Sequence, residues 1–149
     1  AMHRLKDADG NDTAMWARLI MVFPERGSTV QIGPSACPNN CFRWSGEVGL
    51  DTIEGETNPN VAASFEMWFS LDGKEPISGD SGLYRLNGRS GIKMGQTSSF
   101  GSDIIRMFQI VPKYVLVKGR YQRSSPCPCP PGGNGAVVTG STAFMIDYR

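Results

Sequence analysis

Apolar and polar residues alternate most regularly between Ser64 and Leu71. The apolar positions are Phe65, Met67, Phe69 and Leu71, and the intervening positions are Ser64, Glu66, Trp68 and Ser70. Because successive side chains of a strand point to opposite faces, this pattern predicts a β-strand with one face in the core. Trp68 then lies on the opposite face, where a tryptophan is unusual unless it is covered or functional.

Two dipeptides downstream of this stretch are typical of tight hairpin turns. Asp72-Gly73 follows Leu71 directly, and Asn87-Gly88 follows Leu86. Both suit a type I′ turn, whose two central residues need positive φ. The sequence therefore predicts an antiparallel meander with four members, Val61–Leu71, Lys74–Ile77, Leu83–Leu86 and Gly91–Met94.

The rest of the chain contains further short segments with strand character. Pro112 interrupts two of them, which indicates a bend, a bulge or an edge position there. Ala14–Phe23 fits either a helix or a buried strand, and we favour the strand. The other segments are 28–32, 42–44, 48–54, 104–111, 113–123, 136–139 and 143–148.

These segments predict an all-β protein of about nine to eleven short strands. We expect an antiparallel β-sandwich or jelly roll formed by a single domain over residues 14–149, preceded by a flexible polar lead-in over residues 1–13. The 149 residues suffice for one core, and 18 Gly and 10 Pro agree with many turns. No apolar run is long enough to span a membrane, and the first residues lack the apolar core of a signal peptide. A secreted origin stays open, because a mature secreted chain would also lack that core.

The charges are divided between two consecutive segments. Residues 47–80 carry eight acids and one lysine, a formal charge of −7, and residues 85–123 carry eight bases and one aspartate, a formal charge of +7. We expect neighbouring strands whose cross-strand pairs neutralise each other. The alternative is a dipolar surface suited to head-to-tail association or to an anionic partner.

Four cysteines lie in two loops rich in turn residues. Cys37 and Cys41 occur in the first loop, and Cys127 and Cys129 flank Pro128 in the second. A Cys127–Cys129 bridge would close a very small ring, whereas bridges between the loops would each contribute up to about 4–5 kcal/mol in the chain-entropy model. We expect disulfides, with an all-thiolate zinc site or free thiols as alternatives, and no other metal and no cofactor.

The sequence offers little for catalysis. Gly79-Asp80-Ser81-Gly82 resembles the nucleophile motif of trypsin-like serine proteases, but such a serine needs an imidazole as its base, and the only histidine is His3. A glycosidase would need paired carboxylates, for which Glu54, Glu56 and Glu66 are available. We assign no catalytic residue, and a hydrolase is a minor alternative.

Aromatic and charged residues indicate where a ligand could bind. The candidate ligand-binding residues are Trp68, Glu66, Trp44 and Tyr84, and a basic patch is formed by Lys113, Lys118, Arg120 and Arg123. Basic residues interleaved with tyrosines could follow a phosphate backbone, but a pI near 7.9 and the acidic segment argue against a nucleic-acid partner.

These features favour a non-catalytic binding or adhesion module. We expect it to bind a glycan or a protein receptor and to function outside the cell, in the periplasm, or on a virion or cell surface. The alternative is a structural assembly module of a virion or appendage, which would form a homo-oligomer through its acidic and basic segments.

Overall fold

The computed structural model describes residues 2–22, 30–32, 35–37, 42–77, 82–105, 112–122 and 137–147. This part of the chain contains strands and no helix, so the predicted all-β class is confirmed. The ten strands are β1 (Met2–Lys6), β2 (Asp12–Val22), β3 (Val30–Ile32), β4 (Ser35–Cys37), β5 (Phe42–Ile53), β6 (Ala62–Ser70), β7 (Leu83–Lys93), β8 (Thr97–Ile105), β9 (Tyr114–Gln122) and β10 (Val137–Met145).

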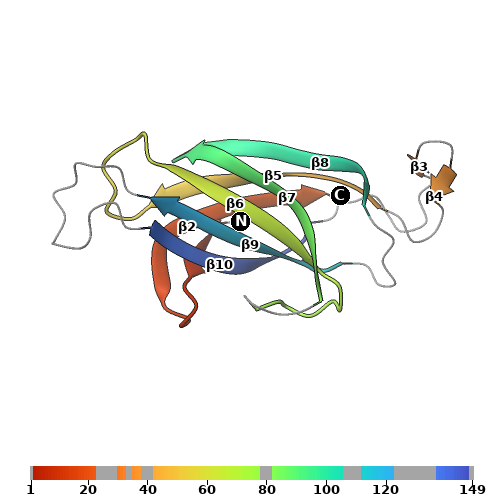
Figure 1. Ribbon diagram of the computed structural model, residues 1–149, viewed down its shortest axis with the longest axis horizontal. Helices are drawn as coiled ribbons and strands as arrows, with labels where there is room; N and C mark the ends of the chain where they lie inside the picture. Colours follow the sequence, from red (N-terminus) through yellow and green to blue (C-terminus); the bar gives the residue numbers. More distant parts are fainter. Residues whose placement is uncertain are drawn as a thin grey trace.

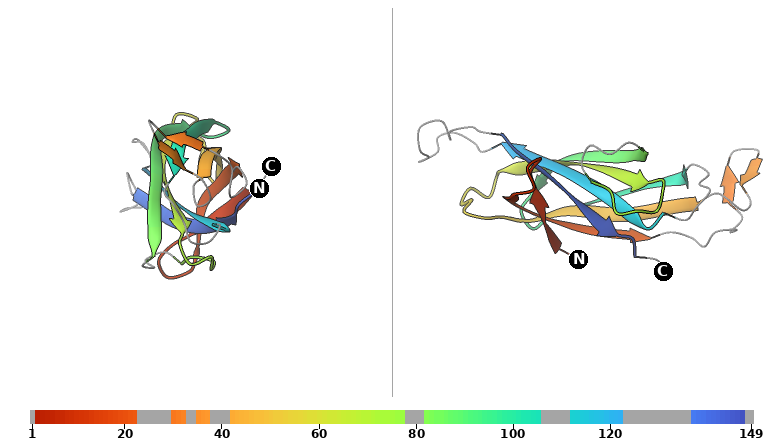
Figure 2. Two further views of the ribbon diagram at one scale, coloured as in Figure 1. Left: turned by 90° about the vertical axis from the view of Figure 1, so that its right-hand side faces the viewer. Right: turned by 90° about the horizontal axis from the view of Figure 1, so that it is seen from below.

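Eight of the strands form one antiparallel sheet in the order β7-β6-β9-β10-β1-β2-β5-β8, and β3 and β4 pair separately (Figure 1). The end-on view in Figure 2 shows these strands arranged around a common interior. The two ends of the sheet lie close together. Arg89 on β7 donates a hydrogen bond of 3.1 Å from Nε to the carbonyl oxygen of Ser99 on β8. The sheet is therefore nearly closed, and a sandwich of two sheets or a jelly roll is not confirmed.

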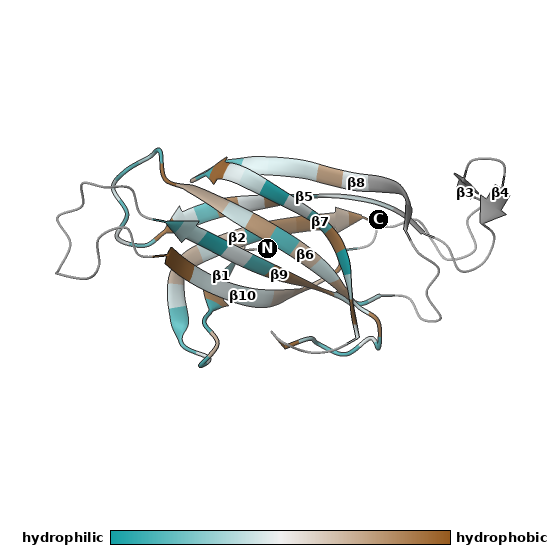
Figure 3. Ribbon diagram, in the orientation of Figure 1, coloured by the Kyte–Doolittle hydropathy of each residue, from teal (hydrophilic) through white to brown (hydrophobic). Residues whose placement is uncertain are grey.

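The interior is filled by the apolar face of each strand. Along β6, Phe65, Met67 and Phe69 are buried while Glu66 is exposed, as the alternation predicted, and Figure 3 shows the alternating hydropathy along this strand. Leu71 differs from the prediction, because it follows the end of β6 and is exposed. Other strands contribute the remaining core residues, which include Leu5, Met15, Leu19, Met21, Trp44, Leu50, Phe100, Val115, Val117 and Phe144.

The predicted meander is wrong in one of its members and one of its turns. Lys74–Ile77 is not a strand, and Asn87-Gly88 is not a turn but lies inside β7. The β6–β7 register shifts between Ala63 and Phe65 and again between Glu66 and Trp68, and each shift places one extra residue in β7. These bulges let the edge strand bend and continue where a hairpin was expected.

The N-terminal residues also differ from the predicted polar lead-in. Met2–Lys6 forms β1, which lies between β10 and β2 in the sheet. Leu5 is the reason, because its side chain is fully buried in the core. The strand interpretation of Ala14–Phe23 is confirmed as far as Val22, the last residue that the structure describes there.

Two glycines allow the sheet to curl tightly around Leu5. Gly119 on β9 and Gly140 on β10 are direct cross-strand partners. A Cβ atom at Gly119 would lie 2.8 Å from Leu5 Cδ2, 2.8 Å from Phe65 Cε1 and 3.0 Å from Met15 Cε, and one at Gly140 would lie 2.9 Å from Leu5 Cβ. Since an added Cβ would have to displace these core side chains, the backbones of β9 and β10 lie directly on the core at this point.

We predict that Gly119→Ala lowers the free energy of unfolding by about 1–3 kcal/mol, because the added methyl overpacks the core. Gly88→Ala is the matched control, since its Cβ would have no neighbour closer than 3.5 Å. Urea denaturation of both variants and the wild type measures the difference. Equal stabilities of the two variants would contradict the packing account.

The turn after β6 is held by a buried hydroxyl. Ser70 Oγ lies 2.8 Å from Asp72 Oδ1 and 2.7 Å from the carbonyl oxygen of Lys74. Asp72 Oδ1 also accepts a hydrogen bond of 2.9 Å from the Lys74 backbone N–H. The Lys74 N–H and the Ser70 hydroxyl lower the pKa of Asp72 from its ordinary value of 3.8.

Because this pKa is lower in the folded chain than in the unfolded chain, ionised Asp72 stabilises the fold above about pH 4 and does so less as the pH falls further. We therefore expect the wild type to be more stable than Asp72→Asn by a larger margin at neutral pH than at about pH 3, where carboxyl groups begin to be protonated. Urea denaturation at both pH values measures it. An advantage that is the same at both would show that the charge of Asp72 contributes nothing.

Candidate functional site

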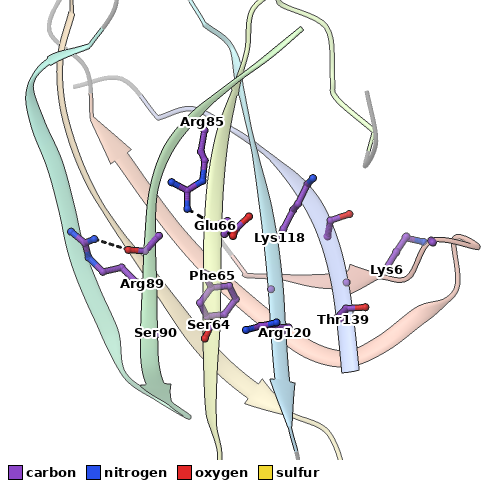
Figure 4. A pocket seen from close by; sticks show the side chains of 15 residues that line it. Lys6, Ser64, Phe65, Glu66, Arg85, Arg89, Ser90, Lys118, Arg120 and Thr139 are labelled. Atoms are coloured by element: carbon purple, nitrogen blue, oxygen red, sulfur yellow. Dashed lines mark hydrogen bonds and ion pairs between the residues drawn. The ribbon is translucent and has the colours of Figure 1, made fainter. Parts of the chain in front are cut away.

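A depression of about 550 Å³ lies on the outer side of the sheet, over β7, β6, β9, β10 and the end of β1 (Figure 4). Its volume is in the range of small-ligand sites. The side chains that line it include Glu66 and Ser64, which alternate with the buried residues of β6 and so point away from the core. The backbones of Gly88, Gly119 and Gly140 contribute to the lining. A Cβ at Gly119 or Gly140 would point into the core, so at these two positions the floor of the depression is backbone.

Strand register places one row of residues across the depression. Lys6 on β1 is opposite Ser141 on β10, which is opposite Lys118 on β9. Lys118 is opposite Glu66 on β6, and Glu66 is opposite Gly88 on β7. Side chains of directly opposite residues stand side by side on the same face of a sheet. Residues from the first and the last third of the chain therefore meet in one line.

The depression is strongly basic. Five basic side chains and one carboxylate line it among the residues that the structure describes, a formal excess of four positive charges. The carboxylate is Glu66, and the bases are Lys6, Arg85, Arg89, Lys118 and Arg120.

Some of these charges have partners, and some do not. Arg85 Nη2 lies 3.8 Å from Glu66 Oε1, and Lys6 Nζ lies 3.5 Å from Asp12 Oδ1 at the edge of the depression. Within the described residues, Lys118 and Arg120 make no ion pair. Their charges are therefore available to an anionic ligand.

Hydroxyl groups surround the basic side chains. Ser64 is the cross-strand partner of Arg120, and Thr139 is its partner on the other side. Ser90 and Ser141 complete the hydroxyl set of the lining. Among the described residues that line the depression, the only aromatic residue is Phe65, whose side chain is buried in the core. The described lining residues thus offer charges and hydrogen bonds, but no aromatic face for stacking.

Trp68 lies beside the depression on the outer face, as predicted, and it is half-buried. Its cross-strand partner Leu116 is only 1 % exposed, although Leu116 alternates with the core residues of β9. Lys118 Nζ lies 5.1 Å from the centre of the Trp68 ring, in a cation–π contact. Trp68 therefore covers Leu116 and supports Lys118.

Two of the four predicted ligand-binding residues belong to the interior instead. Trp44 is 4 % exposed and packs against Phe69 and Phe100, with ring centroids 6.0 and 5.0 Å away. Tyr84 is half-buried and packs against the core. Both residues occupy inward positions of their strands, so neither contributes to the depression.

The predicted basic patch is divided by the structure. Lys118 and Arg120 line the depression. Lys113 precedes the start of β9 and does not line the depression, and Arg123 lies outside the described residues. Sequence reasoning missed Lys6, Arg85 and Arg89 as members of the site. Lys6 had no local signal, because only the pairing of β1 with β10 brings it there.

Among the described residues, the expected neutralisation between the two charged segments is limited to one ion pair, Glu66–Arg85. Other acids of the 47–80 segment pair with the N-terminal strands: Asp51 with Arg18 at 3.2 Å, and Glu54 with Arg4. Arg4 also stacks on Trp16, with Cζ 4.7 Å from the ring centre. This cluster holds β1 against β2 and β5, and it contains none of the basic side chains that line the depression.

Several predicted sites fall on residues that the structure does not describe. Cys41, Cys127 and Cys129 lie outside the described residues, as does the Cys37 side chain, so the predicted disulfides stay a prediction. Ser81 of the protease-like motif also lies outside them. His3 is on β1 with its ring 4.7 Å from that of Phe144. Among the described residues, no group of three or more His, Cys, Asp and Glu could hold a metal ion.

We predict that Trp68→Phe keeps the stability of the wild type within about 1 kcal/mol, because the Trp68 indole Nε1 is buried and has no hydrogen-bond partner among the described residues. Trp68→Ala removes the cover of Leu116 and should cost about 2–3 kcal/mol. Urea denaturation compares the two variants. A loss for Trp68→Phe as large as that for Trp68→Ala would show that the indole N–H is required.

Comparison with known proteins finds no matching family model, no matching curated protein and no matching solved structure. In the part of the chain that the structure describes, no helix has the length and apolar character needed to cross a membrane. The geometry and charge of the depression are consequently the basis for assigning a function.

Proposed function

We propose that the chain is a non-catalytic binding module whose basic depression holds an acidic glycan. The observation that carries the proposal is the excess of five basic side chains over one carboxylate in a depression of about 550 Å³. A sulfate or carboxylate group of a sugar would form charge-assisted hydrogen bonds with Lys118 and Arg120, which have no ion-pair partner among the described residues.

The lining favours a glycan over a single-stranded nucleic acid. Proteins that bind single strands stack bases on aromatic side chains. The depression offers no exposed aromatic ring among its described lining residues, since Phe65 is buried. Ser64, Ser90, Thr139 and Ser141 instead supply hydroxyls that can donate to and accept from the hydroxyls of a sugar.

An acidic glycan is a component of cell surfaces and of the material around cells. We accordingly propose that the protein acts outside the cell, in the periplasm, or on a virion or cell surface. Disulfides between the two cysteine loops would agree with these locations.

The alternative is a structural assembly module of a virion or appendage. Such a module would use the same basic depression to bind an acidic surface of a second copy, and analytical ultracentrifugation at low and high salt tests this alternative.

The double variant Lys118→Gln/Arg120→Gln should bind a hyaluronan octasaccharide about tenfold more weakly than the wild type, because two exposed charge contacts are lost. Titration calorimetry at low ionic strength measures the dissociation constants, and added salt should weaken wild-type binding by screening.

The matched control is Lys74→Gln/Lys113→Gln, which removes the same charge from exposed lysines outside the depression. It should bind like the wild type. The proposal fails if the wild type binds no acidic oligosaccharide, if the control loses as much affinity as the site variant, or if a single-stranded oligonucleotide of equal charge binds more tightly than the glycan.

A further inference from the structure

Glu66 brings a negative charge into the basic depression. It is the only acidic side chain among the described residues that line it, and Figure 4 shows it between Arg85 and Lys118. Its carboxylate lies 3.8 Å from the Arg85 guanidinium, and half of its side chain is exposed. A negative charge at the centre of an anion-binding surface opposes the ligand and therefore needs an explanation.

The row of residues across the strands supplies that explanation. Lys6 and Lys118 lie on strands that are separated by β10, where the row carries the neutral Ser141. Neighbouring strands are about 4.8 Å apart, so the backbones that carry these two lysines are about 10 Å apart. On the next strand after Lys118 the row carries Glu66, and beyond it β7 contributes Arg85 and Arg89. Basic strands thus alternate with a hydroxyl-bearing strand and an acidic strand.

We infer that Glu66 is a specificity-determining residue, which makes the depression select glycans whose acidic groups are separated by neutral sugars and reject glycans that are charged on every sugar. The inference depends on the proposed glycan-binding function and adds the class of glycan. A glycan that runs across the strands, with its acidic groups separated by neutral sugars, places the acidic groups on β1, β9 and β7. Its neutral sugars then present hydroxyls to β10 and β6.

The physical basis is like-charge repulsion between the Glu66 carboxylate and an acidic group of the glycan. A glycan with a carboxylate on every sugar sets one of these groups against Glu66, whereas a spaced glycan presents a hydroxyl that the Glu66 carboxylate can accept a hydrogen bond from. Interactions between exposed charges are small, so the discrimination expected from one carboxylate is about two- to fivefold in the dissociation constant. Glu66→Gln keeps the shape and the hydrogen-bonding capacity and removes the repulsion.

The test compares two octasaccharides, hyaluronan, with a carboxylate on every second sugar, and oligogalacturonate, with a carboxylate on every sugar. Titration calorimetry on the full chain gives both dissociation constants for the wild type, Glu66→Gln and Glu47→Gln. Glu47→Gln is the matched control, because Glu47 is an exposed residue of β5 that does not line the depression. Circular dichroism establishes that the variants are folded.

We expect the wild type and Glu47→Gln to prefer hyaluronan by about two- to fivefold, and Glu66→Gln to lose this preference by binding oligogalacturonate more tightly. The inference is overturned, with the proposed function intact, if Glu66→Gln keeps the wild-type preference or weakens binding of both glycans. If the wild type binds neither glycan, the proposed function itself is overturned.

Discussion

The packing of Leu5, Met15 and Phe65 against the backbone of Gly119 is the contact on which the rest of the structure depends. It joins three strands from separate parts of the chain, β1, β2 and β6, at one point of β9. Because no Cβ stands there, the sheet can curl until its two ends meet near Arg89 and Ser99. The same contact gives the N-terminal strand a place in the sheet, although Leu5 is its only buried residue.

The site follows from this arrangement. Where β9 and β10 lie directly on the core, the outer surface is hollow, and the side chains on either side of Gly119 along β9, Lys118 and Arg120, point outward at its rim. The register that pairs β1 with β10 brings Lys6 to the same row. Core packing and surface charge therefore depend on the same strand register, and a slip of β9 by one residue would turn Lys118 and Arg120 towards the core.

Local patterns in the sequence predicted what depends on local alternation and missed what depends on pairing. The β6 strand and the outward direction of Trp68 follow from a period of two, and the charges of Lys118, Arg120 and Glu66 in the sequence are enough to make them candidate binding residues. Glycines inside strands resemble strand ends in the sequence, and β5, β7 and β10 each continue through such a position, as β7 does at Asn87-Gly88. Trp44 could not be assigned to the core from its three-residue segment, because a short alternating segment does not define which face is buried.

The most direct test of the account is to observe where an acidic glycan contacts the chain. Titration of the ¹⁵N-labelled protein with a hyaluronan octasaccharide, followed by amide chemical shifts, reports this residue by residue. The account predicts that the largest changes fall on Ser64, Glu66, Gly88, Lys118 and Ser141, which line the depression on four neighbouring strands. Changes concentrated on the outer face of β2 and β5, with none in the depression, would contradict it.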